Sequence, residues 1–140
     1  EMFHIGSRIS GLCKEKKLIE ALRLYNPMIN QTIDPSEVTR VTLCYEFCEI
    51  DDSERANDIL ERLDKKLWTR TVTTLIRKLC CAGKVEMASL FFTKLLDKKP
   101  VVDRVTLAAF KTACYDNHKY ELFSMFSDRC SQIESVKDAE

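Results

Sequence analysis

Apolar residues recur at steps of three and four along most of this chain, the spacing that places side chains on one face of an α-helix. Residues 18–28 show the spacing most regularly, and turn-forming residues interrupt it at 30–35, at 51–53 and at Gly83. The pattern therefore predicts amphipathic helices in pairs joined by short turns. Ser36 is placed to cap the start of one helix, and Gly83 to end another in a left-handed conformation.

A register of small residues repeats along the chain. The first three units each contain an apolar residue followed by cysteine, and an alanine stands eight residues after each cysteine. The residues concerned are Leu12-Cys13, Phe47-Cys48 and Leu79-Cys80, with Ala21, Ala56 and Ala88. The intervals between the units are 35 and 32 residues. A period of this length, without strand-like stretches, is typical of stacked helical hairpins and predicts an all-α fold.

The same register predicts the organisation of the chain. We expect a helical-repeat domain over residues 1–130, with repeats at about 2–36, 37–68 and 69–103, a degenerate repeat at 104–130, and a polar tail at 131–140 that frays. In the fourth unit Phe123 stands 35 residues after Ala88. A larger side chain at this position predicts different outer packing, as expected of a unit without a neighbour on one side.

The seven cysteines raise the question of disulfides or a metal site. No C-x-x-C pair occurs, the only histidines are His4 and His118, and only Cys44 and Cys48 are spaced by one helical turn. Three cysteines recur at the same place in successive units, as small core residues do. We therefore expect the cysteines to pack in the core, with no metal site and no cofactor. Reduced thiols fit an intracellular or organellar compartment.

The net charge is zero, but the charges are segregated along the chain. Residues 34–61 contain nine carboxylates and two arginines, a net charge of −7, whereas residues 62–104 contain eleven basic and four acidic residues, a net charge of +7. The basic stretch has two interpretations. It attracts phosphate groups, or it is a solvated face whose charges point outward.

Enzymatic motifs are missing from the sequence. There is no phosphate-binding loop, dinucleotide-binding glycine pattern, nucleophile elbow or zinc-binding helix motif. Asp51 and Asp52 lie at an expected turn, where helix capping explains them, and His118 is expected in another turn. We therefore predict no catalytic residues and no enzyme activity. No apolar run approaches the roughly 20 residues of a membrane span, so no membrane partner is expected.

Two segments resemble pentatricopeptide repeats. The first contains Ile9-Ser10-Gly11-Leu12-Cys13-Lys14, Leu18-Ile19-Glu20-Ala21-Leu22, Met28 and Ile33-Asp34-Pro35-Ser36, and the second runs from Thr71-Val72-Thr73-Thr74-Leu75-Ile76 through Ala88. The tetratricopeptide repeat, with 34-residue units, matches less well. The resemblance implies a right-handed α-solenoid of about four helix-turn-helix repeats, as part of a longer chain and near its C-terminus. Because the chain opens on Glu1 and not on Met, a targeting segment is expected to lie outside it.

Members of this family are mostly plant organellar proteins that bind single-stranded RNA, one nucleotide per repeat. The resemblance therefore implies a location in the mitochondrion or chloroplast and a role in RNA processing, editing, stability or translation. It also implies that each base is read by a residue near the start of the first helix and by the last residue of the repeat. In this chain the pairs are Gly6 with Ser36, Val41 with Trp68, and Thr73 with Asp103.

The third pair is the best formed. In the family, Thr with Asp favours guanine, because a carboxylate can accept hydrogen bonds from the N–H groups of guanine. Arg70 and Val105 would flank that base, and Lys14 is the family's helix-ending lysine. Gly6, by contrast, has no side chain to hydrogen-bond, and Val41 is apolar.

Each of these residues has a structural alternative. Ser36 and Asp103 are good N-caps, Thr73 fits a first helical turn, and Trp68 and Arg70 fit a packed joint in which the ring of Trp68 is buried. The alternative function is a protein-interaction module. In that case a groove lined by Val41 and Trp68 docks a partner helix, or an end repeat binds another subunit or forms a homodimer.

Overall fold

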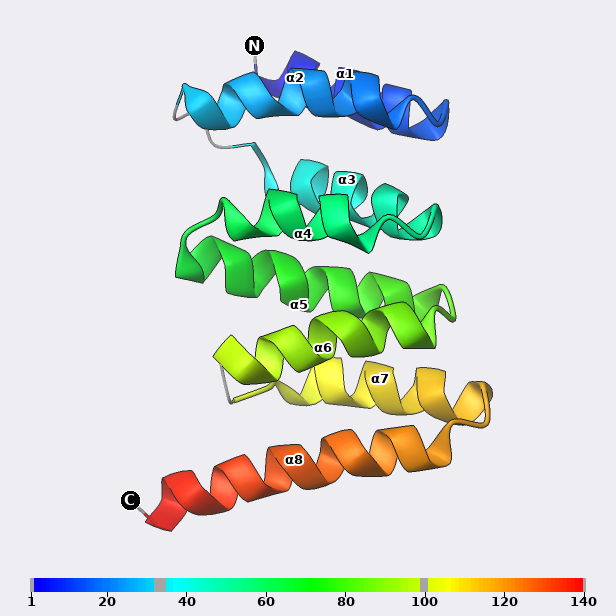
Figure 1. The fold of residues 1–140 in the computed structure, drawn as a ribbon, viewed down its shortest axis with the longest axis vertical. Helices are drawn as coiled ribbons and strands as arrows, with labels where there is room; N and C mark the ends of the chain where they lie inside the picture. The colour runs from blue at the N-terminus through cyan, green and yellow to red at the C-terminus, as the bar shows by residue number, and fades with distance from the viewer. Residues whose placement is uncertain (1, 32–34, 99–100, 140) are drawn as a thin grey trace. The chain divides into compact units, whose positions relative to one another are not determined.

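The computed structural model describes residues 2–31, 35–98 and 101–139. All regular secondary structure in these ranges is helical, which confirms the all-α helical-repeat fold. The helices are α1 (Met2–Lys14), α2 (Leu18–Asn30), α3 (Glu37–Glu49), α4 (Ser53–Glu61), α5 (Lys65–Cys81), α6 (Val85–Lys98), α7 (Arg104–Asp116) and α8 (Tyr120–Ala139) (Figure 1). Within the described residues, none of them is long and apolar enough to cross a membrane.

The chain divides into two compact units, which we call unit 1 (residues 1–71) and unit 2 (residues 72–140). The division falls inside α5. In unit 1, α1 packs against α2, α3 packs against α4, and α3 also contacts α1 and α2. In unit 2, α7 packs against α8 and against α6. Both units are therefore built from helical hairpins.

The same turn closes every hairpin in the described chain. After α5, the N–H of Lys84 donates to the carbonyl of Leu79 (2.9 Å) and the N–H of Gly83 donates to the carbonyl of Cys80 (3.0 Å). These two bonds define a Schellman motif, which needs a residue with positive φ. The residues that supply it are Lys16, Asp51, Gly83 and His118, with φ of 64°, 60°, 75° and 59°. The left-handed cap at Gly83 and the turn position of His118 are confirmed. In the first three hairpins, the pair of an apolar residue and a cysteine marks the last turn of the first helix.

Side-chain caps begin the helices at the predicted turns. Ser36 caps α3, Asp52 caps α4 and Asp103 caps α7, each by accepting a hydrogen bond from the backbone N–H three residues later. Asp64 does the same for α5, accepting from the N–H of Leu67 at 2.9 Å.

Helix α5 begins earlier than the predicted boundary between residues 68 and 69. It starts at Lys65, directly after its cap Asp64, and is 17 residues long, whereas α4 has only nine. Trp68 therefore lies in the first turn of α5 and does not end a repeat. Its side chain is 2% exposed, which confirms that it is buried.

The recurrent small residues form the contacts between helices. Cys13, Cys48 and Cys80 are at most 6% exposed, and Ala21, Ala56 and Ala88 are fully buried. All seven cysteines lie in the described residues; six are buried and Cys81 is exposed. Burial raises the pKa of the Cys80 thiol to about 12 and also raises that of Cys44. The cysteines therefore pack as core residues.

One thiol of the seven should react under native conditions. Buried thiols are neither accessible nor ionised, so we expect an aromatic disulfide reagent at pH 8 to modify Cys81 within minutes and the other thiols only after denaturation. The absorbance of the released thiolate counts them. Cys81→Ser should abolish the fast phase, and a fast phase that persists in this variant would contradict the assigned burial.

The fourth hairpin replaces both small residues by aromatic ones. In the first three hairpins, a cysteine lies three residues before the turn residue with positive φ: Cys13, Cys48 and Cys80. In the fourth hairpin, Tyr115 occupies this position. Tyr115 contacts Phe123, which occupies the alanine position, with 5.9 Å between ring centroids, and the Lys111 ammonium lies 5.5 Å and 5.7 Å from the two rings. Tyr115 is 45% exposed. The packing thus differs from that of the other hairpins, as predicted from Phe123.

Helix α8 extends further than predicted. Its backbone is helical as far as Ala139, so residues 131–139, predicted as a frayed tail, continue the last helix.

Candidate nucleic-acid interface

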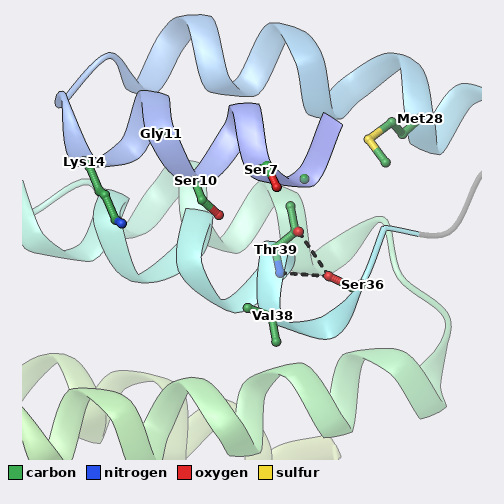
Figure 2. A pocket seen from close by; sticks show the side chains of 9 residues that line it. Ser7, Ser10, Gly11, Lys14, Met28, Ser36, Val38 and Thr39 are labelled. Atoms are coloured by element: carbon green, nitrogen blue, oxygen red, sulfur yellow. Dashed lines mark hydrogen bonds between the residues drawn. The ribbon is translucent and has the colours of Figure 1, made fainter. Parts of the chain in front are cut away.

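An open hollow of about 630 Å³ lies between α1 and the start of α3 in unit 1. Small and hydroxyl-bearing side chains line most of it, and the exposed Lys14 and Val38 stand among them. We call this site the unit 1 hollow. Its lining consists of Gly6, Ser7, Ser10, Gly11, Lys14, Met28, Ser36, Val38 and Thr39 (Figure 2). The structure therefore brings together three residues that the sequence assigned to RNA binding: Gly6, Lys14 and Ser36.

The N-cap of α3 forms one edge of the hollow. The hydroxyl of Ser36 accepts a hydrogen bond from the N–H of Thr39 (3.3 Å) and shares another with the hydroxyl of Thr39 (3.1 Å), as Figure 2 shows. A Cβ atom on Gly6 would lie 3.1 Å from that Thr39 hydroxyl. Gly6 thus lets α1 approach the start of α3 closely, and its lack of a side chain leaves the hollow open.

A shift of 67 residues carries Leu12-Cys13 onto Leu79-Cys80 and carries the lining of the hollow onto a set of unit 2 residues. We call this set the unit 2 counterpart. It consists of Thr73, Thr74, Arg77, Lys78, Cys81, Leu95, Asp103, Val105 and Thr106. The shift reveals equivalent positions that reading pairs alone did not identify, among them Arg77 and Lys78.

The geometry of the N-cap repeats 67 residues later in the sequence. One carboxylate oxygen of Asp103 accepts from the N–H of Thr106 (2.7 Å) and the other from its hydroxyl (3.0 Å), as Ser36 accepts from Thr39. Thr39 and Thr106 are both buried, whereas Ser36 and Asp103 are exposed. The capping interpretation of Ser36 and Asp103 is therefore confirmed.

The two sets differ in charge. Arg77 and Lys78 stand in the unit 2 counterpart where the unit 1 hollow has Ser10 and Gly11, and Cys81 stands in place of Lys14. The counterpart therefore carries two cations and a carboxylate, and the hollow carries one cation. Val38 and Val105, at equivalent positions, are 71% and 61% exposed.

The remaining sequence-assigned residues lie elsewhere in unit 1. Arg70 forms an ion pair with Glu37, with 3.3 Å between Nε and Oε1. Val41 and Trp68 are 5% and 2% exposed. The hypothesis that these two line a groove for a partner helix is wrong, because side chains so buried cannot contact a partner. For the same reason they cannot read a base.

No cluster of three potential metal ligands occurs in the part of the chain that the structure describes. Arg62, in the basic stretch, donates to Asn26 Oδ1 (2.9 Å) and Asn30 Oδ1 (2.8 Å). It therefore links α2 to the end of α4 and does not belong to the hollow.

The repeated hairpins, their shared turn and the repeated cap define a helical-repeat protein. The sequence profile of the PPR repeat matches residues 6–31 and 70–99, which include six of the nine residues of the unit 1 hollow and six of the nine of the unit 2 counterpart. The chain therefore contains two segments that match the pentatricopeptide repeat, and the family of this repeat binds nucleic acid, typically RNA, and is typically not enzymatic. A search of curated proteins finds no match.

Proposed function

We propose that this chain binds single-stranded RNA through the unit 1 hollow and the unit 2 counterpart, and that Thr73 and Asp103 select guanine. The repeated cap geometry supports this proposal, because it presents Ser36 and Asp103 in the same way at the two places where the family reads bases. Val105 would flank the base at Asp103.

Capping and base reading are compatible at Asp103. Each carboxylate oxygen can accept two hydrogen bonds, and each receives one from Thr106. The exposed carboxylate therefore retains acceptor sites for the N–H donors of guanine. The two capping bonds also fix its orientation, which lowers the entropy that binding would otherwise cost.

Positive charge supports phosphate binding in both units. Arg77 and Lys78 belong to the unit 2 counterpart, and Lys14 lines the unit 1 hollow. Cations that contact the backbone of RNA release counterions, so affinity should fall steeply as salt rises.

We further propose a location in the mitochondrion or chloroplast and a role in RNA processing, editing, stability or translation. The family supports this part of the proposal, since its members are commonly organellar.

The decisive variant is Asp103→Asn. Asparagine is as good an N-cap as aspartate, so α7 stays capped, but one acceptor oxygen is replaced by an amide NH2 group, which donates hydrogen bonds. We expect the preference for a G-containing oligoribonucleotide over the same oligomer with A to fall by about tenfold. Fluorescence anisotropy at low salt measures both affinities.

Thr73→Ala should reduce the same preference. Ser36→Asn, a matched cap substitution outside unit 2, should leave the preference for guanine in place. The proposal that unit 2 selects guanine is wrong if the Asp103→Asn protein prefers the G-containing oligomer as strongly as the unsubstituted protein does.

A further inference from the structure

Four positions of the hairpin form a face on which the next helix packs. Helix α3 packs on this face of the first hairpin, where the positions are Ile9, Cys13, Leu18 and Ala21. Helix α7 packs against α6 of the third hairpin, where the positions are Ile76, Cys80, Val85 and Ala88. All of these side chains are at most 6% exposed. The next helix thus buries this face in both hairpins.

The fourth hairpin presents the same face to solvent and fills it with larger side chains. We call it the end face, and it consists of Lys111, Tyr115, Tyr120 and Phe123. Tyr115 and Tyr120 are 45% and 49% exposed, although their ring centroids lie only 5.0 Å apart. Exposed aromatic rings with a polar tip are enriched at protein interfaces, because one side chain supplies both apolar area and a hydrogen-bonding group. The end face therefore has the composition of an interface.

Helix α1 is not suited to cover the end face of a second copy. The later first helices α3, α5 and α7 place fully buried apolar residues at one equivalent position: Leu43, Leu75 and Phe110. In α1 this position holds Arg8, which is exposed. Burying an arginine against aromatic rings without a paired carboxylate is costly. Head-to-tail packing, which would extend into a filament, is therefore disfavoured.

We propose that two copies of this chain associate end to end, each covering the end face of the other about a twofold axis. Such a pair uses the same patch on both copies, so it closes as a dimer and leaves no end face exposed. The aromatic rings of one copy meet those of the other, and the Lys111 ammonium, which lies 5.5 Å from the centroid of its own Tyr115, supplies a cation for the facing rings.

The size of the end face predicts a weak dimer. Helix α7 has 13 residues and is therefore about 20 Å long, and two helices side by side are about 20 Å wide. The face thus covers about 400 Å² in each copy, or about 800 Å² in the pair. Stable complexes bury at least about 1,200 Å². We therefore expect a reversible dimer with a dissociation constant above about 1 μM.

Sedimentation velocity of the full chain without RNA tests the proposal. From about 10 to 500 μM, a range chosen to span the expected dissociation constant, the 16.2 kDa chain should shift reversibly to twice its mass. Tyr120→Glu places a carboxylate in the end face and should raise the dissociation constant at least tenfold. Tyr120 is the first residue of α8, where a carboxylate favours the helix, so this variant should stay folded. Lys111→Glu should have the same effect, and circular dichroism checks the fold of both variants.

Met125→Glu is the matched control. Met125 is 67% exposed on the same helix, but it points about 200° away from Phe123, so this variant should dimerise like the unsubstituted protein. A chain that stays monomeric throughout, or Tyr120→Glu dimers as tight as the unsubstituted ones, overturns the proposal. Species that grow beyond the dimer as concentration rises indicate head-to-tail packing and overturn it too. If the end face binds RNA instead, the chain stays monomeric and Tyr120→Glu weakens RNA binding.

Discussion

Replacing Phe92 by alanine is expected to lower the free energy of unfolding by about 3–5 kcal/mol, because it leaves a cavity in the centre of unit 2. Phe92 on α6 is fully buried. Its ring lies 4.9 Å from that of Phe110 and 5.0 Å from that of Phe126, measured between centroids, so it joins α6 to both α7 and α8. Urea denaturation followed by circular dichroism measures the loss.

Phe123→Ala is the matched control for this prediction. It removes the same atoms from a half-buried ring on α8, and we expect a loss of about 1–2 kcal/mol. Equal losses for the two variants would contradict the prediction that the fully buried ring of Phe92 contributes more to stability than the half-buried ring of Phe123.

Replacing Arg40 by methionine is expected to lower the free energy of unfolding by about 2–3 kcal/mol. Arg40 on α3 is 2% exposed. Its guanidinium donates to the carbonyl of Pro35 and, from Nε, to the hydroxyl of Thr71 (3.3 Å). Methionine fills similar space but leaves these buried acceptors without their donor. Thermal melting measures the loss, and RNA affinity should also fall, because Pro35 directly precedes the cap Ser36.

Arg55→Met tests whether the effect comes from burial. Arg55 pairs with Asp52 at 2.6 Å in an exposed position, and such pairs contribute less than about 1 kcal/mol. If Arg40→Met is as mild as Arg55→Met, the buried hydrogen bonds of Arg40 to Pro35 and Thr71 do not contribute to stability as predicted.

The hairpins could be predicted from the sequence because their signals are local. A cap such as Ser36 acts on a backbone N–H three residues away, and the Schellman turn at Gly83 spans six residues, so both are visible in a short window. The start of α5 was missed for a related reason. The register of small residues places Trp68 at the end of a repeat, whereas the cap Asp64 begins the helix at Lys65.

The candidate site was predicted only in part. The register identified Gly6 with Ser36 and Thr73 with Asp103, but it could not reveal the hollow. That space depends on the distance between α1 and α3, which the approach of Gly6 to Thr39 determines. The roles of Ser10 and Gly11 follow from this distance and not from any periodicity. Val41 and Trp68 were also predicted as a reading pair, but both side chains are buried and cannot contact RNA. Their burial depends on tertiary packing, which a single sequence does not specify.

Cys81 gives the chain a built-in attachment point for a spectroscopic probe. It is exposed, whereas the other cysteines are buried, and it belongs to the set that contains Thr73 and Asp103. A fluorophore coupled there needs no engineered residue, and its emission would report directly on the surface where RNA is proposed to lie. The same buried cysteines that mark the repeat register thus make single-site labelling of the unmodified protein possible.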